Sequence, residues 1–139
     1  MSSDSNKQAM RRVLKAYGEG NHEPVTAILH DDIVWTSNSP VELFRFGGEH
    51  RGKSEAIMGM AMISAEYTTH RYDVLELVGE GDVVWMTARL DMTSRRNGKT
   101  FKVTLASRWQ FQDGMLIGIT EYYDSASVAL AENRITIAR

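Results

Sequence analysis

Three charged residues in the second half of the chain have the side chains needed for acid–base chemistry. Arg89 and Asp91 lie on one short stretch, and Glu121 lies in a later segment. Two carboxyl groups bridged by an arginine can hold opposite protonation states at one pH, because their environments move their pKa values apart. One group can then donate a proton while the other accepts one. These residues form a site only if the elements that carry them bring their side chains together.

The segment from Asp82 to Asp124 contains two turn signals, Arg96-Asn97-Gly98 and Gln112-Asp113-Gly114. Asn-Gly and Asp-Gly between β-prone runs are typical of hairpins. We therefore predict three antiparallel strands, at about residues 83–95, 99–111 and 115–124. Apolar and polar side chains alternate along the middle strand, which predicts that one of its faces lies against a core.

The length of the two turns decides which face of this sheet carries the charges. In the middle strand Leu105 points to the apolar face and Lys102 to the other. Two-residue turns would put all three charged residues on the face of Lys102, and three-residue turns would put them on the face of Leu105. We favour three-residue turns, since they also place Trp85, Ile117 and Ile119 on the apolar face. Leu105 is then predicted to lie between Arg89 and Glu121.

The same register predicts an apolar pocket around the charged residues. Trp109 lies on the predicted concave face, and Tyr123 lies in the row that holds Asp91. Trp35, on an earlier strand, lies near the same site. His70, on the strand beside Arg89 and Asp91, could also face the pocket. We expect these side chains to bind a small apolar molecule.

The composition narrows the classes of function. The chain has 139 residues, of which 42% are hydrophobic and 24% charged, and its formal net charge is −2. This balance gives no electrostatic reason to expect nucleic acid or an anionic membrane as a partner. The absence of cysteine excludes disulfides and thiol chemistry. We expect no cofactor and no metal site, because no spacing of histidines and carboxylates indicates one.

The N-terminal residues are polar and lack the apolar core of a signal peptide. No apolar run approaches the roughly 20 residues that a membrane-spanning helix needs. We therefore expect a cytoplasmic protein that neither crosses nor binds a membrane.

The remaining sequence predicts three helices before the hairpins and a short helical tail after them. The first helix runs from about Ser2 to Gly18, a short second helix follows Asn21, and the third covers Ser54 to Ala65. Strands are predicted at residues 33–35 and 67–78, a loop or helical turn at 41–52, and the tail at 127–133. This order predicts one domain over residues 1–139. Its class is α+β: a curved antiparallel sheet wrapped as a cone around three N-terminal helices, with a central pocket.

The order of elements and three sequence segments resemble the nuclear transport factor 2-like superfamily, in particular its SnoaL-like and ketosteroid-isomerase-like members. The segments are Ala-Ile-Leu-His-Asp-Asp-Ile at 27–33, Arg-Gly-Lys-Ser-Glu-Ala-Ile at 51–57 and Glu-Tyr-Tyr-Asp at 121–124. The resemblance covers about residues 7–131 and implies the cone-shaped fold. The superfamily contains isomerases, cyclases, hydrolases and binding modules, so the fold does not choose among them.

Within this superfamily the site residues resemble those of limonene epoxide hydrolase. The Arg-x-Asp pattern of that family corresponds to Arg89-Leu90-Asp91, and its Asp-Tyr-Phe-Asp pattern corresponds to residues 121–124, with glutamate in first place. The resemblance implies that Asp91 is the acid, Glu121 the base, Arg89 their bridge and Asn38 a ligand of the attacking water. Thr36 stands where that family has a tyrosine, so the group of side chains that holds the water is incomplete.

Two other functions and one structural interpretation remain open. The protein could be a cyclase or isomerase that uses a single acid, or a non-catalytic module that binds a ligand or dimerises. The three charged residues could also form a structural ion-pair cluster. A closed apolar pocket would favour an enzyme, and a cone filled by side chains would favour the non-catalytic module.

The predicted register also puts an apolar patch on the outer face of the sheet. The patch consists of Val84, Met86, Ala88, Leu90 and Met92 on one strand, beside Thr104, Ala106, Thr120 and Tyr122. Such a patch is large for the exposed surface of a monomer. It predicts a homodimer in which the same patch meets itself across a two-fold axis.

Overall fold

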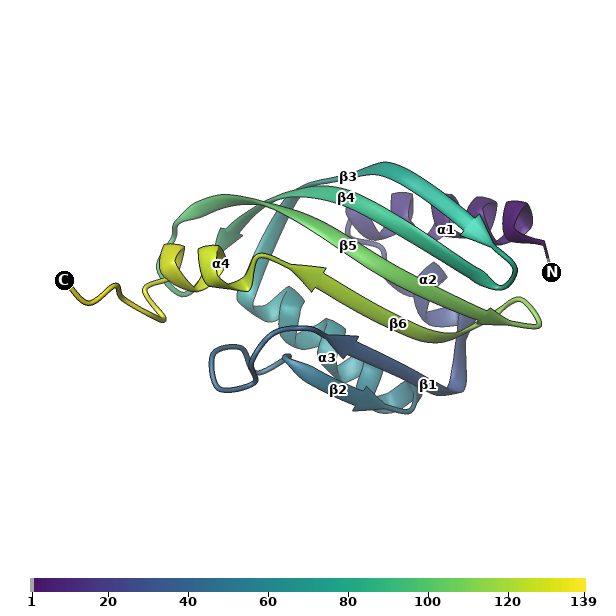
Figure 1. Cartoon of the computed structure of the whole chain (residues 1–139), viewed down its shortest axis with the longest axis horizontal. Helices are drawn as coiled ribbons and strands as arrows, with labels where there is room; N and C mark the ends of the chain where they lie inside the picture. The colour runs from purple at the N-terminus through teal and green to yellow at the C-terminus, as the bar shows by residue number, and fades with distance from the viewer. Residues whose placement is uncertain (1) are drawn as a thin grey trace.

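The computed structural model describes residues 2–139 as a curved sheet with helices on its concave side (Figure 1). The elements are α1 (Ser3–Gly18), α2 (Glu23–Ile28), β1 (Leu29–Ser37), β2 (Gly48–Arg51), α3 (Lys53–Glu66), β3 (Tyr67–Glu80), β4 (Val83–Ser94), β5 (Thr100–Gln112), β6 (Met115–Tyr123) and α4 (Ser125–Ala131). The predicted α+β class is confirmed. Helices α1, α2 and α3 lie behind the sheet in Figure 1, and α4 lies at the end opposite the N-terminus.

The six strands of the described chain form one open sheet in the order β2-β1-β6-β5-β4-β3. Strands β3 to β6 form the predicted antiparallel meander. Strand β1 pairs antiparallel with β2 and parallel with β6, so the sheet is antiparallel except at that one pair. The parallel pair sets Ser37 beside Glu121 and thereby joins the N-terminal half of the chain to the end of the meander.

Helix α1 forms because its apolar residues recur at helical spacing and Ser2 accepts a hydrogen bond from the Ser5 amide at its start. Met10, Val13 and Leu14 are buried on its inner face. The segment predicted as a loop at 41–52 also contains β2. Phe44 and Phe46 in this segment are buried.

The predicted register between β4 and β5 is wrong. Four residues, 95–98, separate Ser94 from Lys99, and the amide of Gly98 donates to the Ser94 carbonyl at 2.9 Å. A four-residue turn has the same parity as a two-residue turn, so Ala88 lies opposite Leu105, and Arg89 lies opposite Thr104. Leu105 therefore does not lie between Arg89 and Glu121.

The turn between β5 and β6 also differs from the prediction, but a second irregularity compensates for it. Asp113 and Gly114 both have positive φ, 51° and 78°, as a two-residue type I′ turn requires. The pairing then shifts by one residue between Gln110 and Phe111, which is a β-bulge in β6. Beyond the bulge Glu121 lies opposite Ser107 on the concave face.

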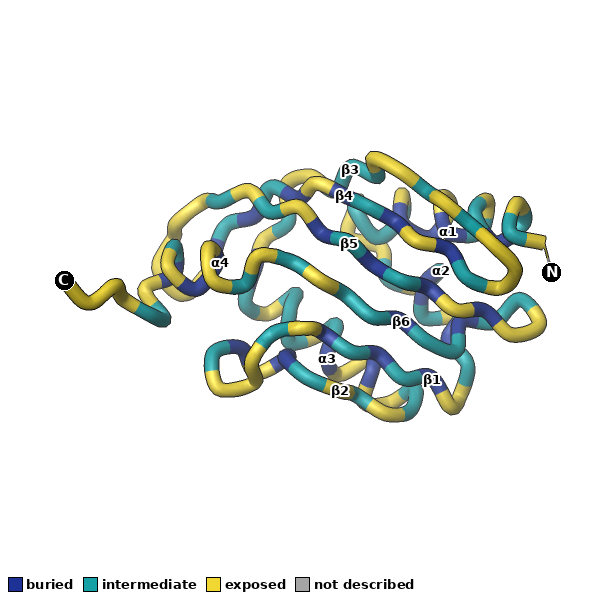
Figure 2. The backbone as a smooth tube through the Cα atoms, in the orientation of Figure 1, coloured by how far each residue is buried: buried dark blue, intermediate teal, exposed yellow. Residues whose placement is uncertain are grey.

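These registers reverse the predicted faces of β4. Val84, Met86, Ala88, Leu90 and Met92 are buried, and the alternation of buried and accessible positions along β4 and β5 is visible in Figure 2. The apolar patch predicted for dimerisation is therefore mostly in the core, and only its members from β5 and β6 lie outside. Trp85, predicted to be inside, is 43% exposed.

Candidate functional site

The concave side of the sheet encloses two adjoining hollows of about 100 and 80 Å³. We call the larger one the helix lobe, because Leu14 and Tyr17 of α1 and Val25 of α2 line it. The smaller one is the tail lobe, lined by Phe46 from the loop after β1 and by Val128 of α4. Both lobes are mainly apolar, as ligand pockets in proteins usually are.

Glu121 is the one acidic residue of the described chain that lines these lobes, and it lines both. Strand β6 carries it inward beyond the bulge. Burial raises the pKa of its carboxyl group to about 6, and the hydrogen bond from Trp35 partly opposes this rise. The Trp35 indole N–H donates to Oε1 at 2.5 Å. Among the described residues no side chain donates a hydrogen bond to Oε2, so this oxygen is available to a ligand.

Trp35 is held in place by contacts on both sides of its ring. Its ring stacks on His50 of β2 at 4.6 Å between centroids, and His50 Nε2 lies 2.7 Å from the Phe46 carbonyl oxygen. On α3, a Cβ atom at Gly59 would lie 2.1 Å from Cζ3 of Trp35, so only glycine leaves room for the ring. This packing fixes the direction of the indole N–H toward Glu121.

Three tyrosines place hydroxyl groups around the carboxyl group. Tyr17 and Tyr72 line the helix lobe, and their rings make an edge contact at 5.8 Å. Burial, and to a lesser extent the charge of Glu121, raise the pKa of both phenols well above the ordinary value. Burial likewise raises the pKa of Tyr123, in the tail lobe, to about 12. All three therefore remain protonated hydrogen-bond donors at neutral pH.

Five of the predicted site residues meet at these lobes. Glu121, Trp35 and Leu105 line both, Trp109 lines the helix lobe, and Tyr123 lines the tail lobe. Sequence reasoning did not place Tyr17 and Tyr72 in the site, because they come from α1 and β3. Their spacing in the sequence carries no signal of this contact.

Arg89 and Asp91 lie on the outer face of the sheet, so the predicted arginine-bridged carboxylate pair does not form. The four-residue turn after β4 turns both side chains away from the lobes. Arg89 is exposed and flanked across the strands by Asp73 and Thr104. Asp91 lies between Arg71 and Lys102, and its Oδ1 is buried without a hydrogen-bond partner.

Asn38 and His70 also lie outside the lobes. Asn38 is exposed because Trp35 and Ser37 point inward at the end of β1 and the next side chain alternates outward. His70 is exposed at an irregularity of β3, where its Nε2 lies 2.7 Å from the Thr93 hydroxyl on the outer face. Neither side chain can contact a ligand beside Glu121.

Residues 2–139 contain no group of three histidine, cysteine, aspartate or glutamate side chains placed to hold a metal ion. In the same part of the chain, every helix is too short or too polar to cross a membrane.

Comparison with known families identifies the family of this chain. A family model described as SnoaL-like domain matches residues 10–119. The chain belongs to the SnoaL-like family. Together with the apolar lobes, this membership supports a small-molecule enzyme or binding module. No curated protein matches the sequence.

Solved structures share the fold at low sequence identity. An NTF2-like protein of unknown function from Burkholderia pseudomallei has a TM-score of 0.83 and 21% identity, covering 94% of this chain and 98% of that one. TerC, crystallised with polyporic acid, has a TM-score of 0.82 and 19% identity, covering 92% and 98%. A protein from Rhodopseudomonas palustris that is proposed to be an isomerase has a TM-score of 0.78 and 24% identity, covering 96% and 98%. These likenesses establish the NTF2-like fold of this SnoaL-like protein.

Proposed function

We propose that this SnoaL-like protein is an enzyme that moves a proton on a small apolar substrate, in a reaction of isomerase or cyclase type, with Glu121 as the base. The main support is a single carboxyl group that is buried between two apolar lobes and has a pKa of about 6. A base is most effective when its pKa lies near the working pH. At pH 7 most of the Glu121 side chains are ionised yet basic enough to accept a proton from carbon.

The proposed step breaks a C–H bond next to a carbonyl group of the substrate. The proton moves to Oε2 of Glu121, and the electron pair of the C–H bond moves onto the substrate, giving an enolate. Tyr17 or Tyr72 donates a hydrogen bond to the enolate oxygen, which stabilises the charge in this mainly apolar site. If the substrate has a C=C bond beside this C–H bond, return of the proton to the far carbon of the resulting dienolate completes an isomerisation. Alternatively, the enolate carbon attacks a second carbonyl, and the alkoxide formed there takes the proton back from Glu121, which completes a cyclisation.

The same geometry argues against epoxide hydrolysis. One-step opening of an epoxide by water needs a base and a separate acid, and Asp91, the expected acid, lies on the outer face of the sheet. Glu121 is left alone among apolar side chains and phenols. A single carboxylate fits proton transfer from carbon better than it fits hydrolysis.

The test uses 2-tetralone, an apolar two-ring ketone with acidic C–H bonds, in deuterated water. We expect the protein to catalyse exchange of these hydrogens for deuterium, followed by NMR. Because the ionised form of Glu121 is the active one, the rate should rise with pH and level off above an inflection near 6. A rate equal to the buffer background at every pH would contradict the proposal.

Asp91→Asn is the matched control for this experiment. It removes a carboxylate that does not line the lobes, so we expect an exchange rate within about two-fold of wild type. If Asp91→Asn abolished exchange, the paired-carboxylate mechanism would be the better explanation and the single-base mechanism would fail.

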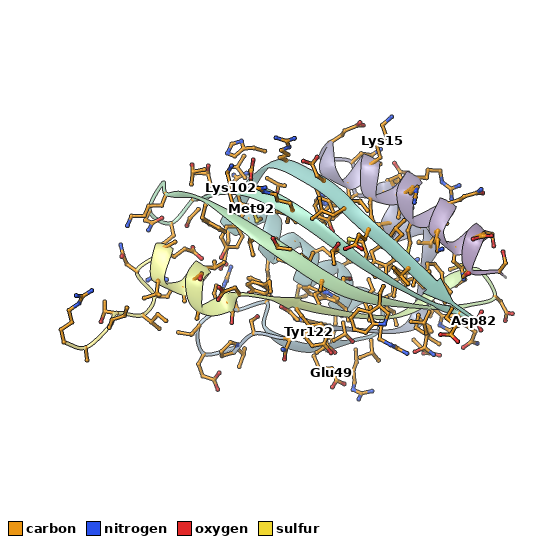
Figure 3. The ribbon with its side chains drawn as sticks, turned by 45° about the horizontal axis from the view of Figure 1, so that its top comes forward. Lys15, Glu49, Asp82, Met92, Lys102 and Tyr122 are labelled. Carbon is orange, nitrogen blue, oxygen red and sulfur yellow. The ribbon has the colours of Figure 1, made fainter. Side chains whose placement is uncertain are left out.

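We also propose that the protein forms a homodimer through the outer face of the sheet. On this face Trp85 stacks on Tyr122, which is 41% exposed, at 6.2 Å between ring centroids. Toward the other end of the face, Arg71, Asp91 and Lys102 form a cross-strand row of alternating charge (Figure 3 labels Lys102 and Tyr122). A second copy related by a two-fold axis can match such a row with its own charges.

Light scattering at micromolar concentration checks the assembly. We expect twice the mass of one chain for wild type and the mass of one chain for Tyr122→Asp, because a buried unpaired carboxylate opposes association. Met58→Asp, at a position on α3 that is 59% exposed, should remain dimeric. A wild-type mass equal to one chain would exclude this interface.

A further inference from the structure

We propose that the site takes an elongated apolar molecule that crosses both lobes and carries an oxygen atom on each side of its middle, which lies beside Glu121. This inference rests on the proposed function only in placing the reacting atom at Glu121. The shape of the site and its hydroxyl groups support the length of the ligand and the presence of its oxygen atoms.

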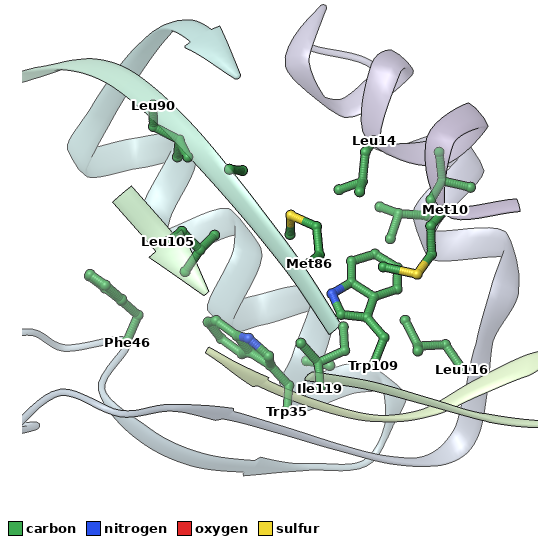
Figure 4. Close-up of a cluster of buried hydrophobic side chains, with 14 of the residues drawn as sticks. Met10, Leu14, Trp35, Phe46, Met86, Leu90, Leu105, Trp109, Leu116 and Ile119 are labelled. Carbon is green, nitrogen blue, oxygen red and sulfur yellow. The ribbon is translucent and has the colours of Figure 1, made fainter. Parts of the chain in front are cut away.

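The two lobes meet at a waist that contains the carboxyl group. Six residues line both lobes: Trp35, Ile63, Leu90, Met92, Leu105 and Glu121. The far ends of the two lobes are lined by different side chains. In Figure 4 Trp35 lies between Phe46, at the end of the tail lobe, and Trp109 with Leu14, at the end of the helix lobe. A ligand confined to one lobe would reach Glu121 only with its tip.

The volumes indicate how large the ligand is. An apolar cavity of about 150 Å³ holds benzene. Each lobe is smaller than that, at about 100 and 80 Å³, so neither accepts more than one ring. A two-ring molecule fits only if one ring lies in each lobe. Its centre then lies at the waist.

Each lobe contains at least one phenol group that makes no hydrogen bond to the protein. Among the described residues, the hydroxyl groups of Tyr17 and Tyr72 in the helix lobe form no hydrogen bond. In the tail lobe the Tyr123 hydroxyl is buried and makes no hydrogen bond, although the hydroxyl groups of Ser37 and Ser39 lie near enough to lower its pKa. A buried donor without an acceptor, as at Tyr123, is costly, and a ligand oxygen in the tail lobe would remove that cost. Tyr17 and Tyr72 line the helix lobe, where their hydroxyl groups can donate to a second oxygen. The donors therefore indicate oxygen atoms on both sides of the reacting centre.

The first experiment measures binding of three probes to wild type by titration calorimetry: phenol, 4-hydroxybiphenyl and 4,4′-dihydroxybiphenyl. The second ring should tighten binding at least about 10-fold, because it buries a further ring in the other lobe. The second hydroxyl should tighten it about 3-fold or more by accepting from the free phenol there. If phenol bound as tightly as 4-hydroxybiphenyl, or if the second hydroxyl weakened binding, the proposal would be overturned.

The second experiment fills one lobe at a time. Thr69→Phe fills the helix lobe and Val103→Phe the tail lobe, because each position lines one lobe and not the other. Both variants should weaken binding of 4,4′-dihydroxybiphenyl at least about 10-fold, whereas only one of them should weaken binding of phenol. Thr68→Phe and Thr104→Phe are matched controls at the adjacent exposed positions, and they should change the affinity by less than about two-fold.

Circular dichroism identifies any variant that fails to fold. In that case Tyr72→Phe and Tyr123→Phe, which remove only a hydroxyl, replace the filled variants, and each should weaken binding of 4,4′-dihydroxybiphenyl about 3-fold or more. Full affinity in a variant with one lobe filled would show that the ligand uses a single lobe. Such a result would leave the exchange of 2-tetralone intact, so failure of this proposal is distinct from failure of the proposed function.

Discussion

Glu121→Gln is expected to unfold with a higher free energy than wild type at pH 8 and to have the same free energy of unfolding at pH 4. The pKa of this carboxyl group is about 6 in the folded protein, against an ordinary value of 4.5. The folded state therefore binds the proton more tightly than the unfolded state does. The stabilisation that this gives is fully present below pH 4.5 and is lost as the pH rises through 6.

The size of the effect follows from the same two values. A separation between 4.5 and about 6 corresponds to about 2 kcal/mol. Glutamine keeps an oxygen that accepts a hydrogen bond from the Trp35 N–H. Because it never ionises, its free energy of unfolding does not fall as the pH rises through 6. Urea unfolding at several pH values measures the difference. Glu80→Gln, at an exposed position, is the control and should show no such dependence. A difference between Glu121→Gln and wild type that did not vary with pH would contradict the expected burial of the charge.

The same substitution should abolish catalysis while it stabilises the protein. An amide cannot accept a proton from carbon, and loss of a general base typically reduces the rate by about 10²- to 10⁴-fold. The exchange of 2-tetralone should therefore fall to the background rate in Glu121→Gln. A buried base is expected to lower stability at neutral pH and to be required for turnover. A residue kept for structure alone would show the opposite change in stability.

Much of the fold could be predicted from the sequence because its signals are local. The helical spacing in α1, the alternation along β5 and the Asn-Gly and Asp-Gly turns each lie within a few residues of the structure they specify. Leu105 and Trp109 face inward as predicted, because β5 alternates without interruption over the stretch that carries them. The short strand β2 escaped prediction because its four residues have no β-prone pattern of their own.

The site could be predicted only in part, because its residues depend on the parity of two turns. The signal Asn97-Gly98 is the same for turns of three and four residues, but one added residue moves Arg89 and Asp91 from the concave face to the outer face. The bulge in β6 had no sequence signal either. Glu121 faces inward as predicted, yet the cause is a two-residue turn followed by this bulge.

The largest loss of stability is expected from Arg134→Met, which would leave a buried carboxylate without its cationic partner. Glu132 is fully buried and accepts hydrogen bonds from Tyr67 at 2.5 Å, Ser94 at 2.7 Å and Arg134 at 3.1 Å. Burial alone would raise the pKa of Glu132, but these three donors hold it below the ordinary value. Arg134 also donates to the Leu43 carbonyl oxygen at 2.6 Å and so ties the C-terminal residues to the loop beside the tail lobe.

Removing one partner of a buried ion pair typically costs about 3 to 5 kcal/mol. We expect Arg134→Met to lower the free energy of unfolding by about that amount, measured in urea at pH 7. The control is Arg45→Met, because Arg45 also pairs with a glutamate, Glu66, but its side chain is 69% exposed; its loss should cost less than about 1 kcal/mol. Adding Glu132→Gln to Arg134→Met should restore part of the stability, since the amide carries no charge to leave unpaired. The double variant could instead be less stable than Arg134→Met alone. The hydrogen bonds of Glu132 to Tyr67 and Ser94, rather than its ion pair, would then provide most of its contribution to stability.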